Sequence, residues 1–259
     1  MPAHLRVAAA LLLAACGGDV AGPRPEPPVP VTRAEDARPL RILFIGNSLT
    51  FYNDLPTRTA EIARVDTTLR WPDPQSVTRS STSLRQHWFL GMAPQRIQAE
   101  RWDYVVLQEG SQDIVQDPET TEVYVTKYDS LARAGGARTM LFLTWTYGDI
   151  PQLQDSVTRV YTRIASHVGT LVAPVGVAWQ RALQLNPTLP LYLPDSIHPA
   201  PVGTYLAANT VFAALYRRTP AGLAGLLAIG DTNIVTLDSA TAALLQTTAW
   251  QVTQPYLPH

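Results

Sequence analysis

Three residues in this chain carry the groups that are needed to activate a serine hydroxyl. Ser48 follows an apolar run that stops at small polar residues, and Asp195 and His198 stand three positions apart near the other end of the sequence. A free serine hydroxyl is a weak nucleophile, so it needs a base within hydrogen-bond reach and an acceptor that orients that base. We therefore expect His198 to be the base for Ser48, with Asp195 as the orienting carboxylate.

A histidine in a loop is more often an ordinary polar surface residue than a catalytic base. His198 lies between Pro194 and Pro199, which favour a loop that is held in place yet exposed. Asp195 is close enough in sequence for a tight turn to bring its carboxylate to the imidazole. These two features favour the catalytic interpretation without deciding it.

Other common motifs of chemistry are absent from the sequence. The frame around Ser48 begins with Gly46 but ends with Thr50, so it is not the G-x-S-x-G turn of many serine hydrolases. Neither H-E-x-x-H nor a glycine-rich phosphate loop is present, and the histidines have no metal-ligand spacing. We expect no metal and no organic cofactor.

Composition limits the classes of partner and the number of domains. The chain has 259 residues, 46% of them hydrophobic and 16% charged, which is enough to bury a full core. The formal net charge is −1, which gives no electrostatic case for nucleic acid as a partner, since that usually needs a basic face. A single cysteine, Cys16, excludes an intramolecular disulfide.

Periodicity predicts strands that alternate with helices after residue 40. Strands are expected at 41–46, 75–79, 104–108, 139–145 and 171–175. Helices are expected at 55–65, 84–100 with an interruption near Gly91, 119–134, 152–168, 202–217 and 239–252. This alternation predicts a parallel sheet with helices on both faces. Active-site residues of such sheets gather at the carboxyl ends of strands, where Ser48 should lie.

The first 39 residues have a different character from the rest. Residues 1–15 form a short positive region and an apolar run too short to span a bilayer, as in a signal peptide. Cys16 follows small residues in a pattern that resembles the bacterial lipobox, so we expect it to be lipidated; an ordinary secretory signal with an incidental cysteine is the alternative. Residues 16–39 are rich in proline and predict a tether, with one domain at 40–259. The expected location is the bacterial cell envelope, with a membrane anchor that holds the protein on the periplasmic side or the outer surface.

Four blocks of sequence, taken in order, resemble those of the SGNH hydrolases, also called GDSL esterases. The block at 44–50 reads F-I-G-N-S-L-T, and the block at 195–199 reads D-S-I-H-P; these two carry the specific resemblance. Weaker similarity covers 78–84 and 103–113. The resemblance implies a three-layer α/β/α fold of flavodoxin type with a five-stranded parallel sheet. It also implies Ser48 as nucleophile, Asp195 as acid and His198 as base.

The resemblance also implies an oxyanion hole, and here the sequence departs from the family. The donors would be the Ser48 N–H, the N–H of Ser81 or its neighbour Ser80 where the family has glycine, and the amide of Gln112 where the family has asparagine. Gln108 is a rival for the amide role. A backbone N–H survives the loss of glycine, but the conformational freedom of glycine does not.

The sequence therefore predicts a serine esterase that hydrolyses carboxylic esters, such as acetylated carbohydrates, through an acyl-serine intermediate. Two alternatives stay open: a non-catalytic envelope lipoprotein that binds glycans or a partner on the same fold, and an acyltransferase with the same triad. Trp145 and Tyr147 follow a predicted strand end, where they would either form a sugar-stacking wall or pack the junction.

Overall fold

A computed structural model describes residues 29–223, 225–229 and 232–258. Its centre is a five-stranded sheet in which every neighbouring pair is parallel, in the order β2-β1-β3-β4-β5. The strands are β1 (Leu40–Gly46), β2 (Pro72–Thr78), β3 (Tyr104–Leu107), β4 (Arg138–Phe142) and β5 (Leu171–Ala173). The predicted fold class is confirmed. Cys16 and the predicted signal segment 1–15 lie outside the described residues.

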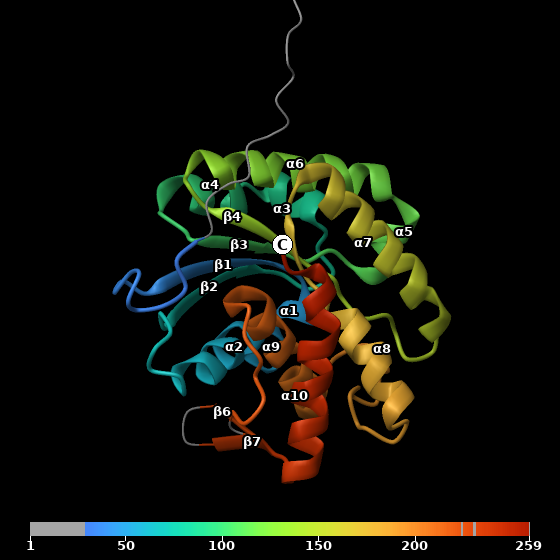
Figure 1. Ribbon diagram of the computed structural model, residues 1–259. Helices are drawn as coiled ribbons and strands as arrows, with labels where there is room; N and C mark the ends of the chain where they lie inside the picture. The colour runs from blue at the N-terminus through green and yellow to red at the C-terminus, as the bar shows by residue number, and fades with distance from the viewer. Residues whose placement is uncertain (1–28, 224, 230–231, 259) are drawn as a thin grey trace, which may run out of the picture.

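Helices cover both faces of the sheet, as Figure 1 shows. On one face lie α2 (Leu55–Arg64), α8 (Val175–Leu185), α9 (Pro201–Tyr216) and α10 (Ser239–Thr253). On the other lie α3 (Leu84–Leu90), α4 (Met92–Ala99), α5 (Ser111–Gln116), α6 (Pro118–Ala134) and α7 (Gln154–Val168). Short pieces complete the chain: α1 (Ser48–Phe51), η1 (Tyr52–Asp54), η2 (Pro151–Leu153), η3 (Gln254–Tyr256) and a hairpin of β6 (Leu226–Ile229) and β7 (Thr232–Thr236).

The strand sequences explain the two cores. Side chains alternate along a strand, so Ile42 and Phe44 of β1 enter one core while Leu43 and Ile45 enter the other. All four are buried, as expected for a strand covered on both faces. β2 carries Pro72 and Pro74, which a central strand could not accommodate without losing ladder hydrogen bonds, and it lies at the sheet edge.

Several element boundaries differ from those predicted. The expected helix at 84–100 is interrupted as predicted, because Gly91 adopts φ +81° and separates α3 from α4. The apolar run after residue 171 was predicted as strand up to residue 175, but Pro174 ends it and Val175 begins α8. Helices α5 and α8 and the β6–β7 hairpin were not predicted, since short apolar runs do not distinguish helix from strand.

The predicted tether at 16–39 is wrong for its described part. Thr32 forms an antiparallel bridge with Leu69. The fully buried Arg70 donates from its guanidinium to the backbone carbonyls of Pro30 and Pro39. Residues 29–39 are therefore part of the ordered domain, which begins before the predicted boundary at residue 40. Among the described helices, none has the length and apolarity that a bilayer crossing needs.

The order of the strands determines where a site can form. β1 lies between β2 and β3, and the chain leaves it through α2 on one face and reaches β3 through α3 and α4 on the other. Connections that diverge to opposite faces leave a crevice at the carboxyl end of the strand between them. Ser48 follows the end of β1 and so lies at this crevice.

Candidate active site

Ser48 is held at the end of β1 by a short turn into α1. Asn47 caps that helix, because its side-chain oxygen accepts the N–H of Leu49 at 3.1 Å. Below the turn, the side-chain oxygen of Gln108 accepts both the Asn47 N–H and the Thr50 hydroxyl at 2.9 Å. Gly46 is required here, since a Cβ would lie 2.6 Å from the Gln108 oxygen.

The loop that carries Asp195 and His198 is folded around the Asp195 carboxylate. Its Oδ1 accepts the backbone N–H groups of Ile197 at 2.9 Å and of His198 at 3.0 Å. Its Oδ2 lies 2.6 Å from His198 Nδ1. Spacing of three residues thus lets one carboxylate close the turn and hold the imidazole, as the sequence predicted.

Ser48, His198 and Asp195 form a continuous hydrogen-bonded chain. His198 Nε2 lies 3.0 Å from Ser48 Oγ, although the two residues are 150 positions apart. The ionised Asp195 carboxylate can only accept, so the imidazole proton resides on Nδ1 and Nε2 is left as the acceptor for the serine hydroxyl. The structure therefore brings together the three predicted triad residues in the order that nucleophile activation requires.

Hydrogen bonds lower the pKa of Asp195 to about 2. The largest cause is the bond to the His198 side chain, followed by the backbone N–H groups of His198 and Ile197. The carboxylate itself is partly exposed to solvent. Asp195 therefore keeps its charge throughout the pH range in which most hydrolases work.

Two residues that sequence reasoning missed support the histidine from the α1 side. The Tyr52 ring stacks on the His198 imidazole, with centroids 4.0 Å apart and planes 16° from parallel. Asn53, with φ +52°, donates to the carbonyl of Pro199 at 3.0 Å and to the hydroxyl of Thr204 at 2.8 Å. Both follow Ser48 closely in sequence, and this proximity was the only available signal.

The residues behind the histidine loop are packing groups. Trp145 is fully buried, stacks on Trp179 at 4.3 Å and donates from its indole N–H to the Ile197 carbonyl. It cannot be a wall for sugar stacking, so packing of the junction is the correct alternative for this residue. Ser196, with φ +59°, accepts the Gly148 N–H through its carbonyl and ties the loop to the segment after β4.

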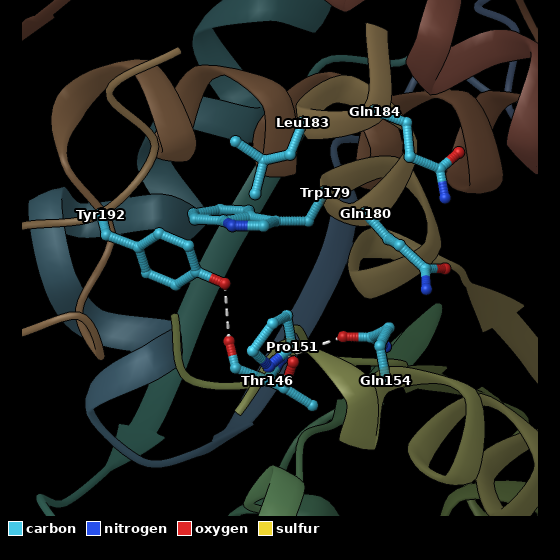
Figure 2. Close-up of a pocket in the computed structure, with 8 residues that line it drawn as sticks. All are labelled: Thr146, Pro151, Gln154, Trp179, Gln180, Leu183, Gln184 and Tyr192. Carbon is cyan, nitrogen blue, oxygen red and sulfur yellow. Dashed lines mark hydrogen bonds between the residues drawn. The ribbon is translucent and has the colours of Figure 1, made fainter. Parts of the chain in front are cut away.

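A cavity of about 220 Å³ lies beside Trp179 and Tyr192 and not at the triad (Figure 2). Tyr192 donates to the Thr146 carbonyl at 2.7 Å across it, and Gln154 accepts the Thr146 N–H at 2.9 Å. None of the triad residues lines it. These contacts fix the strand-end segment to which the histidine loop is attached.

The segment after β2 carries the predicted donor Ser81. β2 runs beside β1 with Thr78 opposite Gly46, and the Arg79 N–H donates to the Gly46 carbonyl. Ser81 adopts φ +51°, a conformation that favours glycine. This conformation explains why glycine is suitable at the matching position of the SGNH blocks. An open hollow of about 510 Å³ begins here and extends along α3 to the exposed Phe89.

His87 of α3 contacts the end of β1. Its Nε2 lies 2.9 Å from the Gly46 carbonyl, and the side chain is buried. Burial lowers the pKa of His87, which favours the neutral ring that donates this bond. His87 is therefore a structural residue at the end of β1.

The segment after β3 carries the two candidate amides, and they differ in accessibility. Gln108 is buried, with its oxygen used by the Ser48 turn and its amide nitrogen enclosed without a partner among the described residues. Gln112 lies in the first turn of α5 and is partly exposed. Solvent reaches part of the Gln112 side chain, whereas the enclosed Gln108 amide nitrogen would have to move before a substrate could reach it. The oxyanion role of Gln112 stays a prediction.

Within the described ranges, no three histidine, cysteine or acidic side chains gather as a metal site would require.

Comparison with solved structures reveals similar folds. A protein from Slackia heliotrinireducens that was assigned to the SGNH hydrolases has a TM-score of 0.60 and 24% identity, over 69% of this chain and 100% of that one. A DUF4886 family protein from Bacteroides uniformis has a TM-score of 0.65 and 18% identity, over 85% and 97%. A catalytic mutant of an acetylxylan esterase from Geobacillus stearothermophilus has a TM-score of 0.54 and 15% identity, over 69% and 94%.

These likenesses show that the chain has the α/β fold of SGNH hydrolases, as the sequence resemblance implied. No protein-family model matches the sequence, and no curated protein matches it either.

Proposed function

We propose that the protein is a serine hydrolase that cleaves carboxylic esters through an acyl-serine intermediate. The observation that supports this most is the hydrogen-bonded chain from Ser48 through His198 to Asp195. A hydroxyl, an imidazole with a fixed tautomer and an ionised carboxylate in this order have one well-understood use, which is acyl transfer. The fold shared with SGNH hydrolases is consistent with the same chemistry.

In the first half of the reaction, His198 Nε2 takes the proton of the Ser48 hydroxyl as Oγ attacks the ester carbonyl carbon. The carbonyl oxygen becomes an oxyanion. The N–H groups of Ser48 and Ser81 and the Gln112 amide are the proposed donors to it. When the tetrahedral intermediate collapses, the bond to the alcohol oxygen breaks and His198 returns its proton to that oxygen.

In the second half, water replaces the alcohol. His198 takes a proton from water, the resulting hydroxide attacks the acyl carbon, and the Ser48 oxygen leaves with the proton returned by His198. Asp195 stabilises the imidazolium that forms twice in the cycle, and its pKa of about 2 keeps it ionised for that purpose. Stacking against Tyr52 keeps the ring in plane with both partners.

For substrate class, we propose esters with a small acyl group on a carbohydrate. An acetylxylan esterase is among the proteins with a similar fold, and the proposed envelope location would expose the enzyme to acetylated glycans. The open hollow from Ser81 along α3 offers room for the larger part of such a substrate.

Hydrolysis of short-chain aryl esters by the full-length chain, beside a Ser48→Ala variant, tests the proposal. We expect Ser48→Ala to lower kcat by roughly 10⁴-fold or more while leaving the melting temperature close to that of the wild type. Ser130→Ala, at an exposed position of α6, is a matched control for loss of one hydroxyl. Activity that survives Ser48→Ala would reject the triad. A folded protein that hydrolyses no ester would favour the non-catalytic binding alternative, and transfer of the acyl group to an added sugar in preference to water would favour the acyltransferase.

We also propose that Cys16 is lipidated and anchors the protein to a membrane of the bacterial envelope. The support is the lipobox-like sequence before this single cysteine. Metabolic labelling with a fatty-acid analogue should mark the wild type and not Cys16→Ser. Equal labelling of the two proteins would reject the anchor.

A further inference from the structure

Glu109 is a buried carboxylate that the triad does not use. It lies two residues after the end of β3 and is 2% exposed. Its Oε2 accepts the backbone N–H of Leu84 at 2.9 Å, and its Oε1 accepts the backbone N–H of Gly110 at 2.9 Å. Burying a carboxylate is costly unless its oxygens are satisfied, so these two N–H groups are what makes the position tolerable.

The two N–H groups belong to the two segments that carry the proposed oxyanion donors. Leu84 is the first residue of α3 and follows Ser81 by three positions. Gly110 is the residue before α5 and precedes Gln112 by two. The segments follow β2 and β3, which flank β1 on opposite sides. One carboxylate thus spans both segments at the carboxyl end of the sheet.

The backbone of Glu109 is fixed as firmly as its side chain. The Tyr161 hydroxyl of α7 accepts the Glu109 N–H at 2.9 Å and lies 2.8 Å from its carbonyl, to which it donates. Tyr128 of α6 reaches the Leu84 carbonyl with its hydroxyl. Glu109 therefore links both loops to the packed helices α6 and α7.

We propose that Glu109 is a positioning residue for catalysis, whose carboxylate fixes the Ser81 and Gln112 segments relative to each other and so sets the geometry of the oxyanion hole. This inference rests on the proposed function. The physical reason is that donors to a developing oxyanion must be in place before the charge forms, and a misplacement of about 1 Å can cost about 10²-fold in rate.

The raised pKa of the Glu109 carboxyl allows this positioning role to be tested. Burial is the main cause that raises its pKa to about 7, opposed by the Leu84 and Gly110 N–H groups. The titratable groups that face it are Asp113 of α5, whose charge raises the pKa further, and the Tyr128 and Tyr161 hydroxyls. Arg85 and Asp117 line the hollow outside it. The ionised form accepts both N–H groups, whereas a proton on one oxygen weakens one of the two bonds.

The test compares Glu109→Gln and Glu109→Asp with the wild type in ester hydrolysis. Glu109→Gln has the same shape but presents an NH₂ to one of the two N–H groups. Glu109→Asp keeps the charge but is one methylene too short to span both. We expect each to lower kcat by about 10- to 100-fold with KM changed by less than about 3-fold. Glu119→Gln, which makes the same change at an exposed position in the first turn of α6, is the control and should keep the wild-type kcat.

A second measurement does not depend on activity. In ¹⁵N–¹H spectra of the Ser48→Ala protein, the Leu84 and Gly110 amide signals should titrate together with a midpoint near pH 7, and Glu109→Gln should abolish that transition. Wild-type kcat in both Glu109 variants, or two amides that titrate independently, would overturn the positioning role. If the wild type itself hydrolyses no ester while the two amides still titrate together, the proposed function fails and the link between the segments stands.

Discussion

The two halves of the candidate site are built in different ways. The proton-transfer half consists of side chains that already touch each other, from Ser48 through His198 to Asp195. The proposed oxyanion half consists of loop groups that are not hydrogen-bonded to one another among the described residues, and neighbours such as Glu109 and His87 hold their segments. The hydrogen bonds of a proton relay can all be present in the free enzyme. The donors of an oxyanion hole bind a negative charge that exists only during the reaction.

This difference has a consequence for the effect of substitutions. Loss of a triad residue breaks a bond that is present at rest and should affect every substrate alike. Loss of an oxyanion donor or its support removes an interaction made only in the transition state. Four substitutions, taken in order of decreasing expected effect, test whether the two halves separate in this way.

Asp195→Asn should have the largest effect of the four. An amide at this position can donate to Nδ1 and thus stabilise the wrong histidine tautomer, so we expect kcat to fall on the order of 10³- to 10⁴-fold. Asp155→Asn, on the exposed start of α7, is the matched control. A loss of less than about 10-fold would show that the carboxylate is not part of the relay.

Gln112→Ala should lower kcat by about 10²- to 10³-fold, because it removes one oxyanion donor. KM for the same aryl ester should change little. Gln108→Ala provides the contrast: its amide oxygen holds the Asn47 N–H and the Thr50 hydroxyl, so it should lower the melting temperature as well as kcat. The role assigned to Gln112 would be wrong if its loss left kcat intact while a folded Gln108→Ala lost activity.

The pH dependence of stability should report on Glu109. Its pKa in the folded protein, about 7, lies above its ordinary value of 4.5, so the folded state binds more protons than the unfolded state between these values. The free energy of unfolding should therefore fall as pH rises from about 4.5 to about 7, by about 3 kcal/mol in total. Urea unfolding across this range should show the slope in the wild type. Glu109→Gln should lack it, and an identical slope in both would contradict the burial argument.

Ser81→Gly should have the smallest effect. Glycine keeps the N–H and removes the penalty of a positive φ, which is offset in part by the greater freedom of glycine in the unfolded chain. We expect the free energy of unfolding to rise by less than about 1 kcal/mol and kcat to stay within about 3-fold of the wild type. A loss of activity above 10-fold would mean that the Ser81 side chain, and not only its N–H, takes part.

The sequence was a good guide wherever a residue acts through its type and local spacing. The apolar runs predicted β1, β3, β4 and β5, because a strand buried on both faces is mostly apolar. The polar edge strand β2 was predicted only from Gln75 on. The three-residue spacing of Asp195 and His198 predicted their contact, since one turn of chain joins them. Sequence-based prediction failed where the outcome depends on packing. Residues 29–39 belong to the domain because the guanidinium of the buried Arg70 donates to their carbonyls. Trp145 is enclosed by Trp179, which lies on a helix that was not predicted.

The sequence by itself determined which groups could do the chemistry: a serine at a strand end, an acid and a base one turn apart, and a fold that places strand ends together. Only the tertiary structure decided which residues support them. Tyr52 on the imidazole, Gln108 beneath the nucleophile and Glu109 between the two loops act through contacts between distant segments. Such contacts leave no periodic or local signal, because they depend on how helices and strands pack and not on how neighbours alternate.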